Sequence, residues 1–431
     1  MAAQVPTDTP SETPTDTAAV AHLLRRTTFG PAPGRLAELA DHGYDAVLDA
    51  VLGRSDPSTF GPVFAAPVLD VPDIDAADDT DDLIFWWFDR MADPLAGLHE
   101  KLVWFWHDHF TSSVDKCSGP ALVAQHRTVR RLALGNFREL VRAMVHDAAM
   151  LQYLDAAGSD GMAPNENLAR ELMELFTLGR GTYAQADVVA AARALAGRWV
   201  DWETAAVEVD DSRRYPGMLE FLGVRGRLGP DDIADIICAQ PACAPFVARK
   251  LHGYLVGTDP DGERLDALAE VFVAADLEIA PLVEAIVDSE TFRTAIRTRP
   301  RFGLEWYVAA ANAIGLGPMT EDRAWHLYVV DQWPFRPPNV AGWGVGERWL
   351  SPSQMLARTN LVFDMFGWEP APLRFDPAHV IADAMAHCGL PDPSASTLAA
   401  LDAAYWAPLD EDTVNRLAVQ ILLTSPEFAL A

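Results

Sequence analysis

The sequence is poor in cysteine and contains no long apolar run. Four cysteines occur among 431 residues, and no two of them are separated by only two residues. Four are too few for a disulfide scaffold at this length, and the paired-thiolate pattern of a structural zinc site is missing. No apolar stretch approaches the ~20 residues of a membrane-spanning helix. We therefore expect buried free thiols, a core that supports folding unaided, and no membrane span.

Basic residues are also scarce. The chain has 33 Lys and Arg against 62 Asp and Glu, which gives a net charge of −29. A protein of this charge repels nucleic-acid phosphates and anionic lipids, so we expect neither nucleic acid nor a membrane as a partner. The acidic residues are typical of solvated helix faces and identify no cationic ligand, while a protein partner stays open.

Several catalytic signatures are missing as well. The sequence has no P-loop, no Gly-x-Ser-x-Gly elbow and no glycine-rich turn between a clear strand and a helix. Gly342, Gly344 and Gly346 alternate with single residues but match the dinucleotide-binding pattern poorly. These absences argue against nucleotide-fold enzymes and serine hydrolases.

Helical periodicity is what the chain has in abundance. Apolar residues recur at helical spacing from residue 17 onward, apart from two expected loops. The spacing also fails between residues 199 and 229, where short aromatic and β-branched runs alternate with turn residues. We predict an all-α, mainly helical, multi-helix globular array with a short irregular or β-hairpin insertion. Its parts would be a helical half at 17–198, the insertion at 199–229, and a second helical half at 230–431 with a Pro- and Trp-rich loop at 333–350.

Residues 1–16 are rich in Thr, Pro and acidic residues. They show neither the basic segment nor the apolar segment of a secretory signal, so we expect a disordered tail and a cytoplasmic location. A Pro- and Asp-rich stretch at 55–81 is expected to be a loop.

The first candidate site is the segment 104–110 (WFWHDHF). It ends a helix that is apolar around its whole circumference, so His107 and His109 are expected to be buried and to need hydrogen-bond partners. Residues two apart on a helix point in nearly opposite directions, so these imidazoles cannot bind one metal unless the helix unwinds. Glu100, Trp104 and His107 do share a face.

The second candidate site is the segment 165–179 (NENLARELMELFTLG). Asn165 suits an N-cap and Gly179 a C-terminal stop, which predicts a helix between them. One polar stripe runs along this helix and consists of Asn167, Arg170, Glu171 and Glu174. The two glutamates repel each other slightly, so something should compensate their charge.

A divalent metal ion is one such compensator, because helical bundles hold metals with carboxylates and imidazoles from different helices. The metal hypothesis uses His107, Glu171 and Glu174 as ligands, although no Glu-x-x-His pair is present. The alternative is a structural network in which hydrogen bonds and salt bridges of Arg170 satisfy the same groups. The sequence leaves both open and favours the network.

Two further segments carry candidate binding residues. His22 and Arg26, together with Arg25, form a basic helix face that either braces the acidic stripe or binds an anion, and bracing is favoured. The loop after residue 332 contains candidates that either line a pocket or clamp two helical halves, with clamping favoured: Arg336, Asn339 and Trp343.

Motifs spread over the whole chain carry a family resemblance. The segments HLLRRTTFGP, EKLVWFWHDHF, PNENLARELMELFTLGRGTY, FVARKL and PFRPPNVAGWGVGERWLSPS occur in this order from His22 toward the C-terminus. In this combination the chain resembles the bacterial family called domain of unknown function 1800. The resemblance implies no reaction, because the family has no assigned activity. It implies export for many members, and this chain lacks the family's usual His-Asp and Lys-Thr run at 210–229.

The sequence thus leaves two functions. In the first, the protein is an enzyme in which His107 and His109 are ligands or general bases, Glu171 and Glu174 are ligands or acid–base groups, and Arg170 assists them. In the second, it is a non-catalytic helical scaffold or partner-binding protein, and the same polar groups link its helices.

Overall fold

The structure is a computed structural model that describes residues 16–55, 64–74, 80–368 and 371–431. The predicted disordered tail lies, apart from its last residue, outside the described residues. Within these ranges the chain forms 21 α-helices and two small sheets, so the prediction of a mainly helical array with a hairpin insertion is confirmed. No helix among the described residues is both long and apolar enough to cross a membrane.

The N-terminal part of the chain is helical from its first described residue. Its helices, in chain order, are α1 (Asp16–Thr27), α2 (Arg35–Ala40), α3 (Tyr44–Val51), α5 (Asp81–Ala92), α6 (Leu98–His109), α7 (Gly119–Leu132), α8 (Phe137–His146), α9 (Ala148–Tyr153), α10 (Asn167–Glu174) and α11 (Gln185–Leu195).

Two antiparallel hairpins follow at the predicted insertion. They pair β1 (Arg198–Val200) with β2 (Val207–Val209) and β3 (Leu219–Phe221) with β4 (Val224–Gly226). Leu222 and Gly223 both adopt positive φ angles, 45° and 82°, which is the geometry of a tight two-residue hairpin turn.

The C-terminal part is helical again. It contains α12 (Pro230–Cys238), α13 (Cys243–Val256), α14 (Gly262–Ala274), α15 (Ile279–Val287), α16 (Glu290–Thr294), α17 (Gly303–Ile314), α18 (Glu321–Val329), α19 (Pro352–Met365), α20 (Val380–His387), α21 (Ala395–Tyr405) and α22 (Glu411–Leu423). Two 3-10 turns, η1 (Asp211–Arg213) and η2 (Gly346–Leu350), complete the elements.

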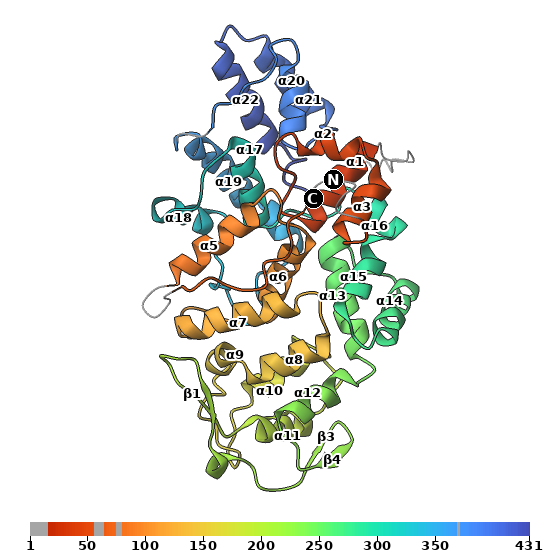
Figure 1. Ribbon diagram of the computed structural model, residues 1–431, viewed down its shortest axis with the longest axis vertical. Coiled ribbons are helices and arrows are strands. Elements are labelled where there is room, and N and C mark those ends of the chain that lie inside the picture. Colours follow the sequence, from red (N-terminus) through yellow and green to blue (C-terminus); the bar gives the residue numbers. More distant parts are fainter. Residues whose placement is uncertain (1–15, 56–63, 75–79, 369–370) are drawn as a thin grey trace, which may run out of the picture.

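Helices from the two sequence halves pack against each other. Figure 1 shows the hairpins and α8–α12 at one end of an elongated molecule, α20–α22 at the other, and α5, α6 and α7 between them. Across the halves, α8 packs on α12, α5 on α17, and α1 on α13 and α16. One hydrophobic core runs through these contacts. The division of the chain into two halves stays a prediction.

Helix α6 lies in the middle of this core. Eleven of its twelve residues are buried, including both of its tryptophans, as its apolar circumference predicts. Trp106 donates its indole hydrogen to the Ala133 carbonyl at 2.9 Å, so even its polar atom is satisfied. The side chains that α6 carries are therefore held in fixed positions by tight packing.

Helix α10 is shorter than the sequence suggests. Asn165 was expected to cap it, but its side chain accepts a hydrogen bond from the Asn167 backbone, and the helix begins at Asn167. Asparagine closes such local turns readily, in competition with a helix start. The predicted stop at Gly179 is also wrong, because the helix ends at Glu174 with Leu175 as its C-cap. Gly179, with a φ of 81°, closes the turn that follows by donating its N–H to the Met173 carbonyl.

Candidate functional site

His107 lies in an aromatic cage at the end of α6. Its ring packs against Trp87, Phe335 and Trp343, and its Nε2 accepts a hydrogen bond from the Phe335 backbone at 3.1 Å. Burial lowers the pKa of His107 to about 3, so the ring is neutral at physiological pH. The imidazole thus joins α6 to the loop at 333–350.

His109 faces a different set of neighbours. Its Nε2 donates to the Phe176 carbonyl at 2.9 Å, and its Nδ1 lies 3.5 Å from the Lys250 ammonium. Burial and the nearby Lys250 charge lower the pKa of His109. Since α6 remains helical through His109, the two imidazoles diverge as the helical geometry predicts.

Glu100 is fully engaged at the other end of α6. Its two carboxylate oxygens accept hydrogen bonds of 2.7 and 2.6 Å from the Arg130 guanidinium. The Trp87 indole donates to the same carboxylate at 2.7 Å. A buried carboxylate with a two-pronged arginine partner is compensated without a metal.

The acidic stripe of α10 is compensated in part, at Glu174, by neighbouring residues of the same region. Glu174 pairs with Arg180 at 2.6 Å and accepts from the Tyr183 hydroxyl at 3.0 Å, and the Arg180 hydrogen bond lowers its pKa. Burial, and then the Glu174 charge, raise the pKa of Glu171. Arg170 bonds Glu166 and Gln185 at 2.9 and 3.1 Å. The exposed Asn167 contacts Asp155 at 3.4 Å.

The structure does not assemble the expected metal ligands. His107 sits inside the aromatic cage, while Glu174 is committed to Arg180 and Tyr183. Within the parts of the chain that the structure describes, no group of three or more His, Cys, Asp or Glu side chains is arranged to hold a metal ion. The set of His107, Glu171 and Glu174 fails because helical spacing fixes the face of each residue but not the distance between helices.

The basic face of α1 does not brace the acidic stripe. His22 contacts the Phe292 carbonyl at 2.8 Å, Arg25 donates to the Gly389 carbonyl at 3.0 Å, and Arg26 donates to the Thr298 hydroxyl at 2.8 Å. All three side chains are buried. They therefore tie α1 to the C-terminal part of the chain.

The loop at 333–350 clamps the end of α6. Trp343 donates its backbone N–H to Asp108 at 2.8 Å, and Arg336 pairs with Asp115 at 3.4 Å. Asn339 closes a local turn by accepting from the Ala341 backbone. At Gly342, whose φ is 80°, an added Cβ would lie 2.2 Å from the Asp108 carboxylate, so only glycine fits. These contacts support the clamping interpretation.

Asp108 is a polar residue whose importance the sequence analysis missed. Asp108 as a whole residue is partly exposed, in contrast to His107 and His109 on either side, which are buried. Burial nevertheless raises its pKa to about 7, while the Trp343 N–H and the Lys250 charge act in the opposite direction. Burial likewise lowers the pKa of Lys250. The only sequence signal was its position between His107 and His109.

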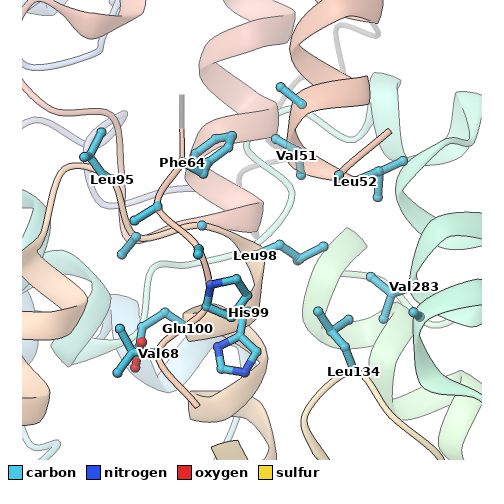
Figure 2. Close-up of a pocket in the computed structure, with 18 of the residues that line it drawn as sticks. Val51, Leu52, Phe64, Val68, Leu95, Leu98, His99, Glu100, Leu134 and Val283 are labelled. Atoms are coloured by element: carbon cyan, nitrogen blue, oxygen red, sulfur yellow. The ribbon is translucent and has the colours of Figure 1, made fainter. Parts of the chain in front are cut away.

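A pocket of about 690 Å³ opens beside the first turn of α6. Figure 2 shows Val51 and Leu52 from the end of α3 on one side of it, and Leu134 and Val283 near His99. A strap of residues 64–68 forms another wall. Two hydrogen bonds hold this strap: the Ala65 N–H donates to the Leu95 carbonyl at 2.8 Å, and Arg130 Nε donates to the Val68 carbonyl at 2.7 Å.

His99 and Glu100 are the polar groups that α6 contributes to this mainly apolar pocket. His99 Nε2 donates to the Arg130 carbonyl at 2.7 Å, so the lone pair of the neutral ring is on Nδ1. Among the described residues, Nδ1 has no hydrogen-bond partner. Burial lowers the pKa of His99, which favours the neutral form.

The family model described as "Protein of unknown function (DUF1800)" matches residues 22–430. The chain belongs to this family. Neither the comparison with curated proteins nor that with solved structures gives a match. The family resemblance noted in the sequence is thereby confirmed over nearly the whole chain.

The DUF1800 match contains every wall of the pocket as well as the His-Asp-His end of α6. The sequence analysis placed its candidates at the latter, whereas the pocket lies at the opposite end of the same helix. His99 was overlooked because its partners are the carbonyl of Arg130, 31 positions away, and a strap without regular structure. The spacing of residues within a helix does not predict contacts with segments so far away in the sequence.

Proposed function

We propose that this DUF1800 protein binds a small, predominantly apolar organic molecule in the pocket beside α6, with His99 as its hydrogen-bonding anchor. The observation that carries the proposal is the pocket itself: about 690 Å³, with apolar walls and one oriented imidazole. Ligand sites typically occupy 300–1,000 Å³ and combine apolar walls with few placed polar groups.

The charges around the pocket favour a neutral ligand. Glu100 is balanced by Arg130, and on the rim Arg90 pairs with Asp93 at 2.7 Å. His99 is neutral and offers Nδ1 as an acceptor. A molecule with a hydroxyl or N–H donor and an otherwise apolar body complements this arrangement.

The proposal favours the enzyme interpretation over the pure scaffold, because a scaffold needs no ligand pocket. The Arg130 carbonyl fixes the ring and its tautomer, which is the arrangement of a histidine that accepts a proton from a bound hydroxyl. His99 is then the candidate general base, in place of His107 and His109.

The test is a fluorescence titration with N-phenyl-1-naphthylamine, a neutral aromatic probe with one N–H donor. We expect saturable binding with one site per chain. Ala50→Phe fills the pocket from α3 and should abolish it, whereas Ala400→Phe, on the exposed face of α21, should not. His99→Phe removes the acceptor and should weaken binding about fivefold, roughly the effect of one hydrogen bond. Binding unchanged in Ala50→Phe would refute the pocket as the site.

A second candidate function rests on Asp108 and Lys250. A carboxyl with a pKa of about 7, close to an ammonium, is suited to general acid–base catalysis near neutral pH. Hydrolysis of p-nitrophenyl acetate provides a simple readout. We expect a pH–rate inflection near 7 that disappears in Asp108→Asn, and an unchanged profile in that variant would exclude this role.

A further inference from the structure

Six cationic side chains are buried together where α1, α6, α17 and α19 meet the segment 298–301. Each is no more than 3% exposed: Arg25, Arg26, Lys101, Arg299, Arg301 and Arg358. We call this set the arginine cluster. Glu305, on α17, is the buried carboxylate that the cluster shares.

Glu305 satisfies only part of the cluster. It binds Arg299 through two hydrogen bonds of 2.9 and 3.0 Å and pairs with Lys101 at 2.5 Å. Burial, followed by the Arg299 charge, lowers the pKa of Lys101 to about 7, with Glu305 opposing. The Glu305 carboxylate therefore pairs with the Arg299 guanidinium and with the Lys101 ammonium, which is only partly charged at neutral pH.

The other arginines rely on neutral acceptors. Arg25 donates to the Gly389 carbonyl, Arg26 to Thr298 and the Ala295 carbonyl, and Arg358 to the Arg301 carbonyl at 3.0 Å. Arg301 stacks on the Phe428 ring at 4.2 Å, and its Nη1 is buried without a hydrogen-bond acceptor among the described residues.

Eight buried guanidinium nitrogens of the cluster have no acceptor among the described residues. They belong to five arginines: Arg25 (Nε, Nη2), Arg26 (Nε, Nη1), Arg299 (Nε), Arg301 (Nη1) and Arg358 (Nε, Nη1). Burying an unpaired charge is far more costly than burying a neutral group, so native proteins pair or solvate such charges. A set of orphaned donors on several cations is therefore an indication of an anion.

The arginines are close enough to act on one another. Burial, then Arg25, lowers the pKa of Arg301 to about 9, and Arg358 and Arg299 contribute in the same direction. Burial lowers the pKa of Arg358 to about 10, against the effect of Glu305. The like charges around Arg301 thus repel, and a negative charge among them would relieve that repulsion.

We propose that the arginine cluster binds a small inorganic anion, chloride, between Arg301, Arg358 and the α1 arginines. In Arg26 and Arg358 the free nitrogens, Nε and Nη1, lie on opposite edges of the guanidinium and do not form the two-pronged edge that grips carboxylates and phosphates. Among the described arginines of the cluster, Arg25 alone keeps both nitrogens of such an edge, Nε and Nη2, free. A spherical anion accepts single N–H donors from several directions. This inference is independent of the ligand pocket.

Thermal unfolding at constant ionic strength tests the proposal, with sodium chloride replaced stepwise by sodium gluconate, whose anion is too large for a closed site. We expect the midpoint to rise with chloride and then saturate, because a ligand that binds only the folded state stabilises it. Phosphate in place of chloride should not reproduce the rise. Equal midpoints in chloride and gluconate, or a rise with phosphate alone, would overturn the assignment.

Arg301→Met should remove the chloride dependence. Arg198→Met is the matched control, because Arg198 is equally buried but donates to the carbonyls of Leu195 and Val145. The control should lose stability and keep its chloride response. If Arg301→Met does not fold, Arg301→Lys preserves the charge and should shift half-saturation to higher chloride.

Crystals grown in sodium bromide give a direct readout. We expect an anomalous peak within hydrogen-bonding distance of Arg301 and Arg358 that is absent from Arg301→Met crystals. A peak that persists in this variant would mark an adventitious ion. Density for water alone at this position would also overturn the proposal.

Discussion

Two buried polar regions of this protein are built in opposite ways. At the end of α6, His107 and His109 are neutral, and each has a backbone partner. In the arginine cluster, charged groups outnumber the carboxylate of Glu305, and eight donors lack acceptors within the part of the chain that the structure describes. The first region is complete as a structural element, whereas the second needs a further component. The segment 104–110, the most conspicuous motif in the sequence, is therefore the region in which both imidazoles already have partners.

The largest expected effect comes from removing the shared carboxylate of the cluster. Glu305→Gln leaves Arg299 and Lys101 buried without a counter-charge, and we expect the free energy of unfolding to fall by about 3–5 kcal/mol. Urea denaturation measures this loss. Glu171→Gln, at a partly exposed carboxylate, should change stability by less than about 0.5 kcal/mol. Similar losses in both variants would contradict the role of Glu305 as the shared counter-charge of the cluster.

The clamp at the end of α6 should also be sensitive. Gly342→Ala places a methyl group 2.2 Å from the Asp108 carboxylate at a positive φ, so we expect a loss of about 2–4 kcal/mol by urea denaturation. Gly344→Ala is the control, because its Cβ would meet only the flexible Arg348 side chain at 3.1 Å. Equal stability of the two variants would show that the loop does not close on α6.

Acid should destabilise the imidazole region. The folded pKa of His107, about 3, lies below its unfolded value of 6.5, so the unfolded chain takes up the proton first. Stability is then lost as the pH falls from 6.5 toward 3, by up to about 1.4 kcal/mol per pH unit for this residue. Urea denaturation between pH 7 and pH 5 should show a shallower loss in His107→Gln. The exposed His146→Gln should retain the wild-type slope.

Asp108 should show the reverse pH dependence on a smaller scale. Its folded pKa, about 7, lies above its unfolded value of 3.8, so the folded protein holds the proton longer, and stability falls as the pH rises from 3.8 to 7. Asp108→Asn retains an acceptor for Trp343 and avoids the buried charge. We expect it to be about 1 kcal/mol more stable than wild type at pH 8 and indistinguishable at pH 4. A less stable variant at pH 8 would assign the ionised carboxylate a structural role.

Local sequence patterns predicted the helices and the hairpin insertion, but not which residues contact one another in the folded chain. The buried circumference of α6 and the insertion with hairpins follow from local patterns, and the structure has both. Both predicted ends of α10 were wrong, because Asn165 bonds within its own turn and the helix ends at Glu174. The expected metal ligands have other partners: Glu174 pairs with Arg180, six residues away, and His107 accepts a hydrogen bond from Phe335, 228 positions away.

The sequence by itself determined the helical class, the family, the acidic surface and the divergence of His107 and His109, because these depend on composition and on the fixed geometry of one helix. Tertiary structure alone decided that the His99 ring lines a pocket and that the charges of Arg25 and Arg358 act on Arg301. Those neighbourhoods arise from packing between segments far apart in the chain. Pairing at that range depends on the shape of the whole core, which no local pattern records.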